Sequence, residues 1–285
     1  MTEVAIPATQ NRRRELFAAL LRSNSFLTGL TIVLFWVFCS LFGSYIVPYD
    51  PLAEDVLNAL APPAAAHWFG TDQLGRDVFS RVIVGSRDIL IVAPLATILA
   101  TAVGTVLGLL TGYFRGILDD VISRLIEAAM AIPGVIVSLL AIVALGTSEN
   151  TVIIVIGLSF GPVIARTVRS AVLAERELDY VAAATLRREN SAHIMFIEIL
   201  PNVLPPILVE STVRLGYAIF AVATLSFLGF GLQPPSPDWG LSISTNYSMI
   251  SGGYWWTVLF DAVAIASLVV GVNLMAEGLH GALDD

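Results

Sequence analysis

The sequence has no lysine, a single cysteine and three histidines, and charged residues make up only 13% of its 285 residues. Without lysine, the chain cannot contain the Gly-x-x-x-x-Gly-Lys-Ser/Thr loop that cradles nucleotide phosphates. The lone Cys39 excludes an internal disulfide. His67, His193 and His280 stand in no metal-binding spacing. We therefore expect this chain to have no catalytic residue, no cofactor site and no metal site.

Apolar side chains are the abundant class. They make up 56% of the sequence before glycine is counted, whereas soluble domains reach about 45–50% with glycine included. A water-soluble fold of this size cannot bury so much apolar surface in one core, which points to the lipid bilayer. The net charge of −8 argues against a nucleic-acid partner, because phosphate backbones attract basic surfaces. The composition therefore predicts a membrane protein.

Six stretches are long and apolar enough to cross a bilayer as helices, which takes about 20 residues each. We predict an all-α membrane protein with six transmembrane helices at Phe26–Val47, Ile89–Tyr113, Val121–Leu145, Thr151–Val172, Val203–Phe230 and Tyr254–Met275. Pro205 and Pro206 lie near the start of the fifth span, where a helix tolerates proline best.

Arginine placement predicts the orientation, because basic residues collect on the cytoplasmic side. With a cytoplasmic N-terminus, eleven arginines lie inside: Arg12, Arg13, Arg14, Arg22, Arg115, Arg124, Arg166, Arg169, Arg176, Arg187 and Arg188. Only Arg76, Arg81 and Arg87 lie outside. Both termini are therefore expected in the cytoplasm.

This topology divides the chain into three parts. Residues 1–25 form a cytoplasmic N-terminal segment, and residues 26–87 hold the first transmembrane helix and an extracytoplasmic loop. Residues 88–285 form a five-helix core with a cytoplasmic segment at about 173–201. The first span is too long for a signal peptide and lacks a small-residue cleavage site, so we expect it to be retained.

The cytoplasmic segment has the composition of a helix. Acidic residues precede three consecutive alanines at Ala182, Ala183 and Ala184, and Pro201 is expected to mark a sharp re-entry into the membrane. The alanines give a surface with little side-chain bulk, which suits close docking against a partner. The residues alone fit equally an amphipathic helix that rests on membrane lipid.

Five separated motifs resemble one family, each beside or within a predicted span. They are the run from His67 to Arg81, the turn Gly112-Tyr113-Phe114-Arg115-Gly116, the triplet Ala131-Ile132-Pro133, the run from Asp179 through Ile199-Leu200-Pro201-Asn202, and the run from Leu225 to Gly240. In this order they resemble the C-type permease subunit of the dipeptide, oligopeptide and nickel family of bacterial ABC importers.

The resemblance implies a type I ABC importer permease fold in the bacterial inner membrane. It also implies a second, homologous permease subunit, one or two ATPase subunits that bind ATP and magnesium, and an extracytoplasmic substrate-binding protein. The positions that correspond to the family's coupling motif to the ATPase are Asp179, Tyr180, Ala182, Ala183, Ala184, Arg187, Arg188 and Pro201, and Ala182 lacks the acidic residue or arginine that the family usually has there. The family usually has glycine at the position of Arg188, so an altered docking geometry is expected there.

Charged residues inside spans are candidates for function. Glu210 and Arg214 are four residues apart in the fifth span and can pair on one helix face, either to neutralise each other or to line the pathway. Asp261 is expected to face the pathway or the outer surface, and Glu127 is expected to pair with an arginine. Gly104, Gly108 and Gly112 give a small-residue face for packing within the subunit or against another.

The outer aromatic residues have two interpretations. Trp239, Tyr254, Trp255 and Trp256 fit an interfacial belt, and the proline-rich segment 234–240 could contact the binding protein. For the whole chain, the alternative to a permease subunit is a self-sufficient secondary transporter or channel, and an intramembrane enzyme is the weakest candidate. The sequence does not indicate which solute is carried.

Overall fold

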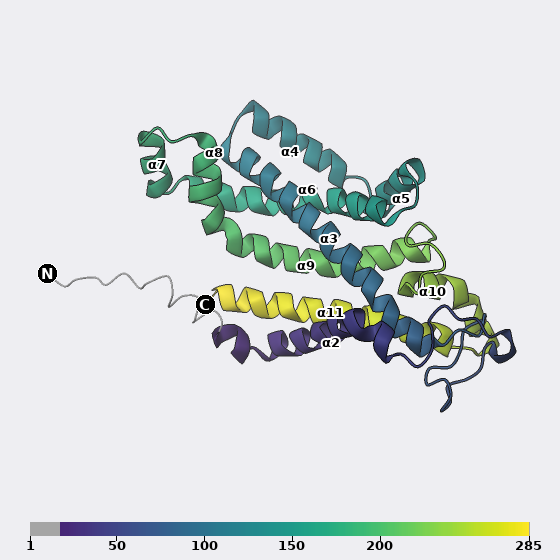
Figure 1. Cartoon of the computed structure of the whole chain (residues 1–285). Helices are drawn as coiled ribbons and strands as arrows, with labels where there is room; N and C mark the ends of the chain where they lie inside the picture. Colours follow the sequence, from purple (N-terminus) through teal and green to yellow (C-terminus); the bar gives the residue numbers. More distant parts are fainter. Residues whose placement is uncertain (1–17, 285) are drawn as a thin grey trace.

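A computed structural model describes residues 18–284, and they are helical with no strand in that range. The long helices are α2 (Asn24–Ile46), α3 (Val78–Tyr113), α4 (Ile117–Met130), α5 (Gly134–Leu145), α6 (Glu149–Arg176), α9 (Leu200–Phe227) and α11 (Trp256–Asp284) (Figure 1). Shorter elements are η1 (Val56–Asn58), α7 (Asp179–Leu186), α8 (Ser191–His193), the π-helix η2 (Ile194–Ile199), α10 (Trp239–Asn246) and η3 (Tyr247–Gly252).

Five helices of the described chain are long and apolar enough to span a membrane, and the α4–α5 pair makes a sixth span if counted as one. The six-span prediction is confirmed in this sense, but a continuous third span over Val121–Leu145 is wrong. α4 and α5 meet at an angle of 89°. Pro133 is responsible, because it lacks a backbone N–H and disfavours helical geometry at the residue before it. The second span is also longer than predicted, since α3 begins at Val78.

The small-residue face of α3 packs within this chain, which answers the question left open by the sequence. A Cβ atom on Gly104 would lie 2.6 Å from Cβ of Ile164, and one on Gly108 would lie 2.5 Å from Cβ of Val168, both on α6. These distances leave no room for a side chain. The backbones of α3 and α6 therefore approach closely, in the manner of small-xxx-small helix pairs.

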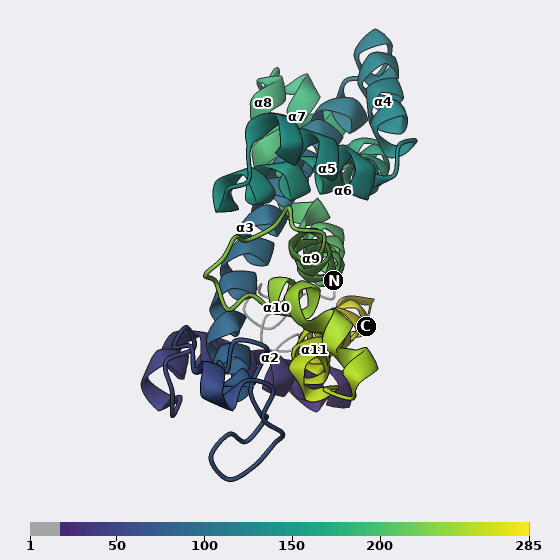
Figure 2. The ribbon, with the colours of Figure 1, turned by 90° about the vertical axis from the view of Figure 1, so that its right-hand side faces the viewer.

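The two ends of the helical assembly have different contents. The start of α2 and the end of α11 lie at the same end as α7, while α10 and the long loop between α2 and α3 lie at the opposite end (Figures 1 and 2). We call these the inner end and the outer end, following the arginine distribution. Arg12, Arg13 and Arg14, which contribute to that distribution, lie outside the described residues.

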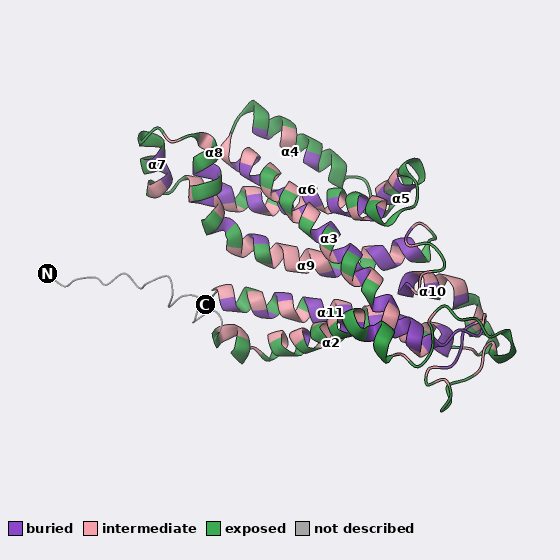
Figure 3. Cartoon of the chain, in the orientation of Figure 1, coloured by how far each residue is buried: buried purple, intermediate pink, exposed green. Residues whose placement is uncertain are grey.

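The buried apolar residues form two clusters. One joins α2, α5, α10, α11 and the outer parts of α3, α6 and α9. The other joins α7, η2 and the inner parts of α3, α6 and α9. Figure 3 shows that α4 and α7 carry mostly exposed residues, whereas the outer end of α3 is largely buried. The transmembrane core thus continues into the inner segment and holds it in place.

Two of the outer tryptophans belong to the core. Trp239 is fully buried, donates a hydrogen bond from Nε1 to the carbonyl of Val82 at 2.8 Å, and packs edge-on against Trp36. Trp256 is 7% exposed and donates to the carbonyl of Thr71. An interfacial belt is therefore wrong for these two residues, while Trp255 is about half exposed.

Candidate functional site

The inner segment forms a short helical hairpin between α6 and α9. α6 ends at Arg176, α7 follows almost at once, and a tight turn at residues 187–190 leads into a helical stretch that runs from Ser191 to Phe227. Pro201 was expected at a sharp re-entry, and this is wrong, because it lies inside that continuous stretch. The π-helical turn of η2 directly before it has wider geometry, which accommodates a residue without a backbone N–H.

The turn after α7 keeps the shape that usually requires glycine. Arg188 has φ 58°, in the left-handed region. Its N–H bonds to the carbonyl of Thr185, and the N–H of Glu189 bonds to the carbonyl of Ala184, which together form a Schellman cap. The arginine therefore adopts a conformation that costs about 1 kcal/mol more than it would for glycine. The turn itself therefore keeps its shape without glycine, and the altered docking geometry expected at Arg188 stays a prediction.

Two faces of α7 have different roles. Val181 and Ala184 are buried in the inner apolar cluster, which fixes the helix to α3, α6 and η2. Ala182 and Ala183 are exposed, as is Asp179 in the first turn. Leu186 is 84% exposed at the tip. The sequence analysis did not select Leu186, although an apolar residue after three alanines was the available signal.

Tyr180 ties α7 to the helices on either side. Its hydroxyl donates to Oε2 of Glu175 at 2.7 Å and accepts a hydrogen bond from Nδ2 of Asn202 at 3.2 Å. Burial, and then the hydrogen bond to the Glu175 carboxylate, raise the pKa of Tyr180 to about 12. The phenol is therefore neutral at physiological pH and acts as a fixed bridge between α6 and α9.

Arg187 is the centre of an exposed ionic group. Its Nε bonds to Oε1 of Glu189 at 2.6 Å, and its terminal nitrogen lies 3.3 Å from Oε1 of Glu198. The hydrogen bond that Arg187 donates to the Glu189 carboxylate raises the pKa of Arg187. Glu189, His193 and Glu198 lie close enough together to bind a metal ion, but the guanidinium already supplies the positive charge between the two carboxylates. We assign no metal to this group.

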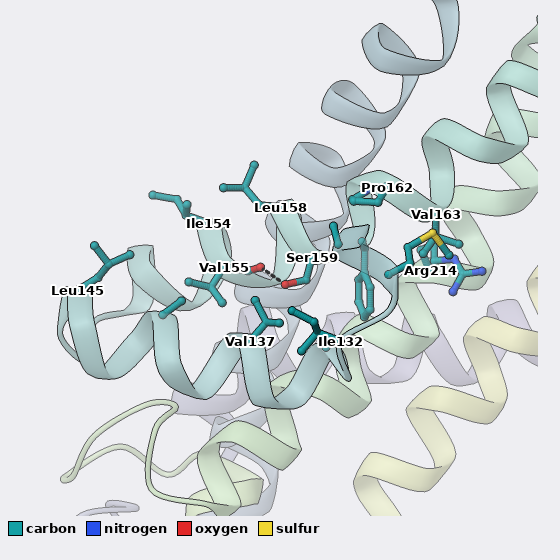
Figure 4. A pocket seen from close by; sticks show the side chains of 15 residues that line it. Ile132, Val137, Leu145, Ile154, Val155, Leu158, Ser159, Pro162, Val163 and Arg214 are labelled. Carbon is teal, nitrogen blue, oxygen red and sulfur yellow. Dashed lines mark hydrogen bonds between the residues drawn. The ribbon is translucent and has the colours of Figure 1, made fainter. Parts of the chain in front are cut away.

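A cavity that is open at the surface lies beside the bend between α4 and α5. Its volume is about 430 Å³, and α6 and α9 complete its wall. Figure 4 shows Leu145 at one end and Arg214 at the other. The predicted pair is confirmed as a contact, because Nε of Arg214 lies 2.6 Å from Oε1 of Glu210. The Arg214 guanidinium also lies 5.0 Å from the ring centre of Tyr217.

Glu127 does not form the predicted ion pair with an arginine among the described residues. Arg169 of α6 pairs instead with Asp119 near the start of α4, through two hydrogen bonds of 2.7 Å each. Glu127 contributes to the electrostatic surroundings of Arg169 from a longer distance. The sequence analysis missed the Asp119–Arg169 pair because fifty residues separate its members.

Asp261 faces neither the pathway nor the outer surface, so both sequence-based expectations are wrong. It is 1% exposed, and neither of its carboxylate oxygens has a hydrogen-bond partner in residues 18–284. Arg81, Asp238 and Asp72 are the charged groups that act on it. Arg81 is itself buried and donates to the carbonyls of Pro51 and Ser236 at 3.0 and 3.3 Å. Asp261 thus belongs to a buried polar core that fixes the outer loops.

The rest of that core comes from the run after His67. Arg76 bonds to Asp72 at 2.7 Å, and the Asp77 carboxylate accepts hydrogen bonds from the backbone and hydroxyl of Ser80. His67 lies 2.9 Å from Asp77 through Nδ1. This motif therefore has a structural function in shaping the outer end.

The apolar helices, with a bent third span and a close α3–α6 pair, define a multi-pass membrane protein. The family model described as binding-protein-dependent transport system inner membrane component matches residues 104–285. A second model, the N-terminal transmembrane domain of oligopeptide transport permease C, matches residues 12–63. The chain therefore belongs to the binding-protein-dependent inner-membrane permeases of bacteria, and the resemblance seen in the sequence is confirmed.

Individual relatives cover nearly the whole chain. It is 38% identical to the dipeptide transport system permease protein DppC of Escherichia coli K12 over an alignment of 288 positions, which covers 99% of this chain and 95% of that protein. It is 36% identical to the protein of the same name in Alkalihalophilus pseudofirmus, over 95% and 89% of the two chains. It is 37% identical to a putative peptide transport system permease protein of Brucella suis, over 93% and 89%.

Proposed function

We propose that this chain is one of two permease subunits of an ATP-driven importer for dipeptides or related short peptides. The observation that carries the proposal is α7, which is fixed on one face to the transmembrane core and exposed on the other. The names of the relatives, which refer to dipeptide or peptide transport, support the choice of solute. ATP and magnesium are bound by the partner ATPase subunits, since a chain without lysine has no phosphate-binding loop of the usual type.

The ATPase docks on the exposed face of α7. Ala182 and Ala183 allow close approach, and Leu186 provides an apolar side chain that a groove in the partner can bury. Movement of α7 passes directly to α6 and α9, because Val181, Ala184 and Tyr180 connect α7 to both. A rigid connection of this kind is what a machine needs to convert closure of the ATPase into movement of the spans.

The second permease subunit packs on the exposed side of α4 and α5. Ile132, Leu140 and Val143 are more than half exposed there. The cavity beside the bend lies next to the same face, so that two permease subunits enclose a pathway between them. A substrate-binding protein delivers the solute at the outer end, where the buried polar core holds the loops in a fixed shape.

The experiment that tests this proposal replaces Ala183 with glutamate in the complete transporter. The added bulk and charge on the exposed face of α7 should abolish uptake while the protein still inserts, and should separate ATP hydrolysis from transport. Ala192→Glu is the matched control, because Ala192 is an exposed alanine of α8 outside the docking face. Normal ATP-driven uptake by the Ala183→Glu variant would contradict the assignment of α7.

Purification of the C-terminally tagged chain in mild detergent gives an independent test. A second six-span permease and ATPase subunits should co-purify with it. A self-associated chain that transports solute with a proton or sodium gradient, and without ATPase, would instead identify a secondary transporter.

A further inference from the structure

The cavity beside the α4–α5 bend is apolar with one charged exception. Among the described residues of its wall, Arg214 is the single charged side chain. The hydroxyl of Ser159, the other polar side chain in Figure 4, donates to the carbonyl of Val155 at 2.7 Å. Placing an arginine in an apolar cavity within a membrane span costs free energy, which binding of an anionic group can offset.

Arg214 has hydrogen-bonding capacity to spare. Its Nε binds Glu210, and its guanidinium lies over Tyr217, yet its two terminal nitrogens make no hydrogen bond to any residue in 18–284. The side chain is 20% exposed, at the end of the cavity. Neutralisation by Glu210 explains the pair, but it does not explain a planar donor group left open to a cavity. Carboxylates are the anions that such a fork binds best.

The cavity extends from Arg214 toward the outer end. A second cavity of about 280 Å³ shares Gly134, Ser159 and Phe160 with the first and is lined by Tyr217 and Thr224 farther along α9. In the first cavity, Leu145 and Ile154 lie near the outer ends of α5 and α6. The two volumes together suit a short, extended molecule with one anionic end and apolar side groups.

We propose that Arg214 binds the C-terminal carboxylate of a peptide in transit, while the apolar walls on α5, α6 and α9 accommodate the peptide's side chains. This inference rests on the proposed function and adds the point of contact. Glu210 positions the guanidinium from one side and Tyr217 supports it from another. The site orients the peptide with its carboxylate toward the middle of the membrane and its amino end toward the outside.

A cysteine reporter tests the site directly. The only native cysteine, Cys39, is 1% exposed, so Ser159→Cys places one accessible thiol in the cavity wall. The complete importer carrying this variant is reconstituted in phosphatidylcholine vesicles and labelled with a maleimide, without binding protein or nucleotide. Leucyl-leucine and its C-terminal amide are then compared for the concentration that halves the labelling rate of this chain.

The free acid should protect the thiol at a concentration at least about tenfold lower than the amide, the factor expected from one charge-assisted pair. Adding Arg214→Gln should bring the two concentrations together. Arg166→Gln is the matched control, because it removes an arginine of α6 that lines a different cavity. It should leave unchanged the ratio of the protecting concentration of the amide to that of the free acid. Equal protection by acid and amide in the parent, or protection by neither, overturns the proposal.

A second variant and a second lipid composition test the same proposal. Arg214→Lys keeps the ion pair with Glu210 but loses the planar fork, so the ratio should fall even if Arg214→Gln does not fold, and an unchanged ratio overturns the proposal. In vesicles that contain phosphatidylglycerol, protection without peptide would show that a lipid phosphate fills the site, which also overturns the proposal.

Loss of ATP-driven uptake by the wild-type importer would count against the proposed function, whereas normal uptake with no preference for acid over amide would count against this site alone.

Discussion

At the outer end, six charged side chains are 9% exposed or less: Asp72, Arg76, Asp77, Arg81, Asp238 and Asp261. At the inner end, the Arg115–Glu177 and Arg187–Glu189 pairs lie at the surface, with both arginines more than half exposed. The outer charges are buried among groups of their own chain, so folding of this chain fixes the shape of that end. The inner charges stay hydrated, so their pairs contribute little to the stability of this chain.

The largest effect is expected from Arg81→Met at the outer end. It leaves the buried Asp261 without the arginine that offsets its charge and removes the more distant of the two arginines beside Asp72, and breaking a buried pair costs about 3–5 kcal/mol of unfolding free energy. Thermal unfolding of the detergent-solubilised protein measures this loss of stability, and a low yield of monodisperse Arg81→Met protein would support the same conclusion. The matched change Arg115→Met at the exposed inner pair should cost about 0–1 kcal/mol. Similar losses in both variants would contradict the contrast between the two ends.

The pH dependence of stability should come from the outer end. Burial raises the pKa of Asp238, which lies in the loop before α10, from 3.8 to about 6. The folded state therefore binds a proton that the unfolded state releases, and stability should fall by up to about 3 kcal/mol as pH rises from about 4 to about 6. Asp238 caps α10 by accepting from the N–H of Leu241.

Asp238→Asn isolates this titration, because asparagine caps a helix as well as aspartate does. The melting temperature of this variant should change less between pH 4 and pH 6 than that of the parent. Parallel melting curves for the two proteins would show that the pH dependence arises elsewhere.

In the inner half, the close approach of α3 and α6 is expected to control stability. In Gly108→Ala the new methyl would lie 2.5 Å from Cβ of Val168, so α3 and α6 must separate, at a cost of about 1–3 kcal/mol. Gly281→Ala makes the same change on α11 where no atom lies within 4 Å, and helix propensity predicts a gain of about 1 kcal/mol. Melting temperatures of the two variants should shift in opposite directions. A gain in both would show that α3 and α6 have room between them.

The smallest effect is expected at the turn after α7. Arg188→Gly relieves the left-handed conformation at the Schellman cap and should stabilise α7 locally by about 1 kcal/mol. In this variant, hydrogen exchange of the backbone amides at positions 188 and 189 should be slower than in the parent protein. Arg188→Ala provides the control, because it removes the same charge without relieving the backbone strain. Equal protection in both variants would mean that the charge, and not the backbone, controls the turn.

The local features of the fold could be predicted from the sequence. The apolar stretches, the polar segment before Pro201 and the absence of a nucleotide-binding loop are properties of neighbouring residues. The bend at Pro133 was missed because apolar content, summed along Val121–Leu145, is the same for a straight helix and a broken one. Pro201 was misread for the converse reason, since a π-helical turn lets the helix continue through it.

The site was predicted in part. The Glu210–Arg214 pair is local, four residues apart on one helix, and its contact follows from helix geometry. Its position at the end of a cavity does not, because α4, α5 and α6 make the other walls. For α7, composition identified the segment, but which alanines are exposed depended on how the helix packs on its neighbours.

The sequence by itself determined that the protein lies in the membrane, roughly where the chain crosses it, and which polar segment separates the fourth and fifth spans. Hydropathy and arginine placement decide these properties residue by residue. Only the tertiary structure decided which charges are buried and what they meet, as in Arg81 with the carbonyl of Ser236 and Arg169 with Asp119. A buried charge is stabilised by groups that packing brings to it, and those groups come from distant parts of the chain.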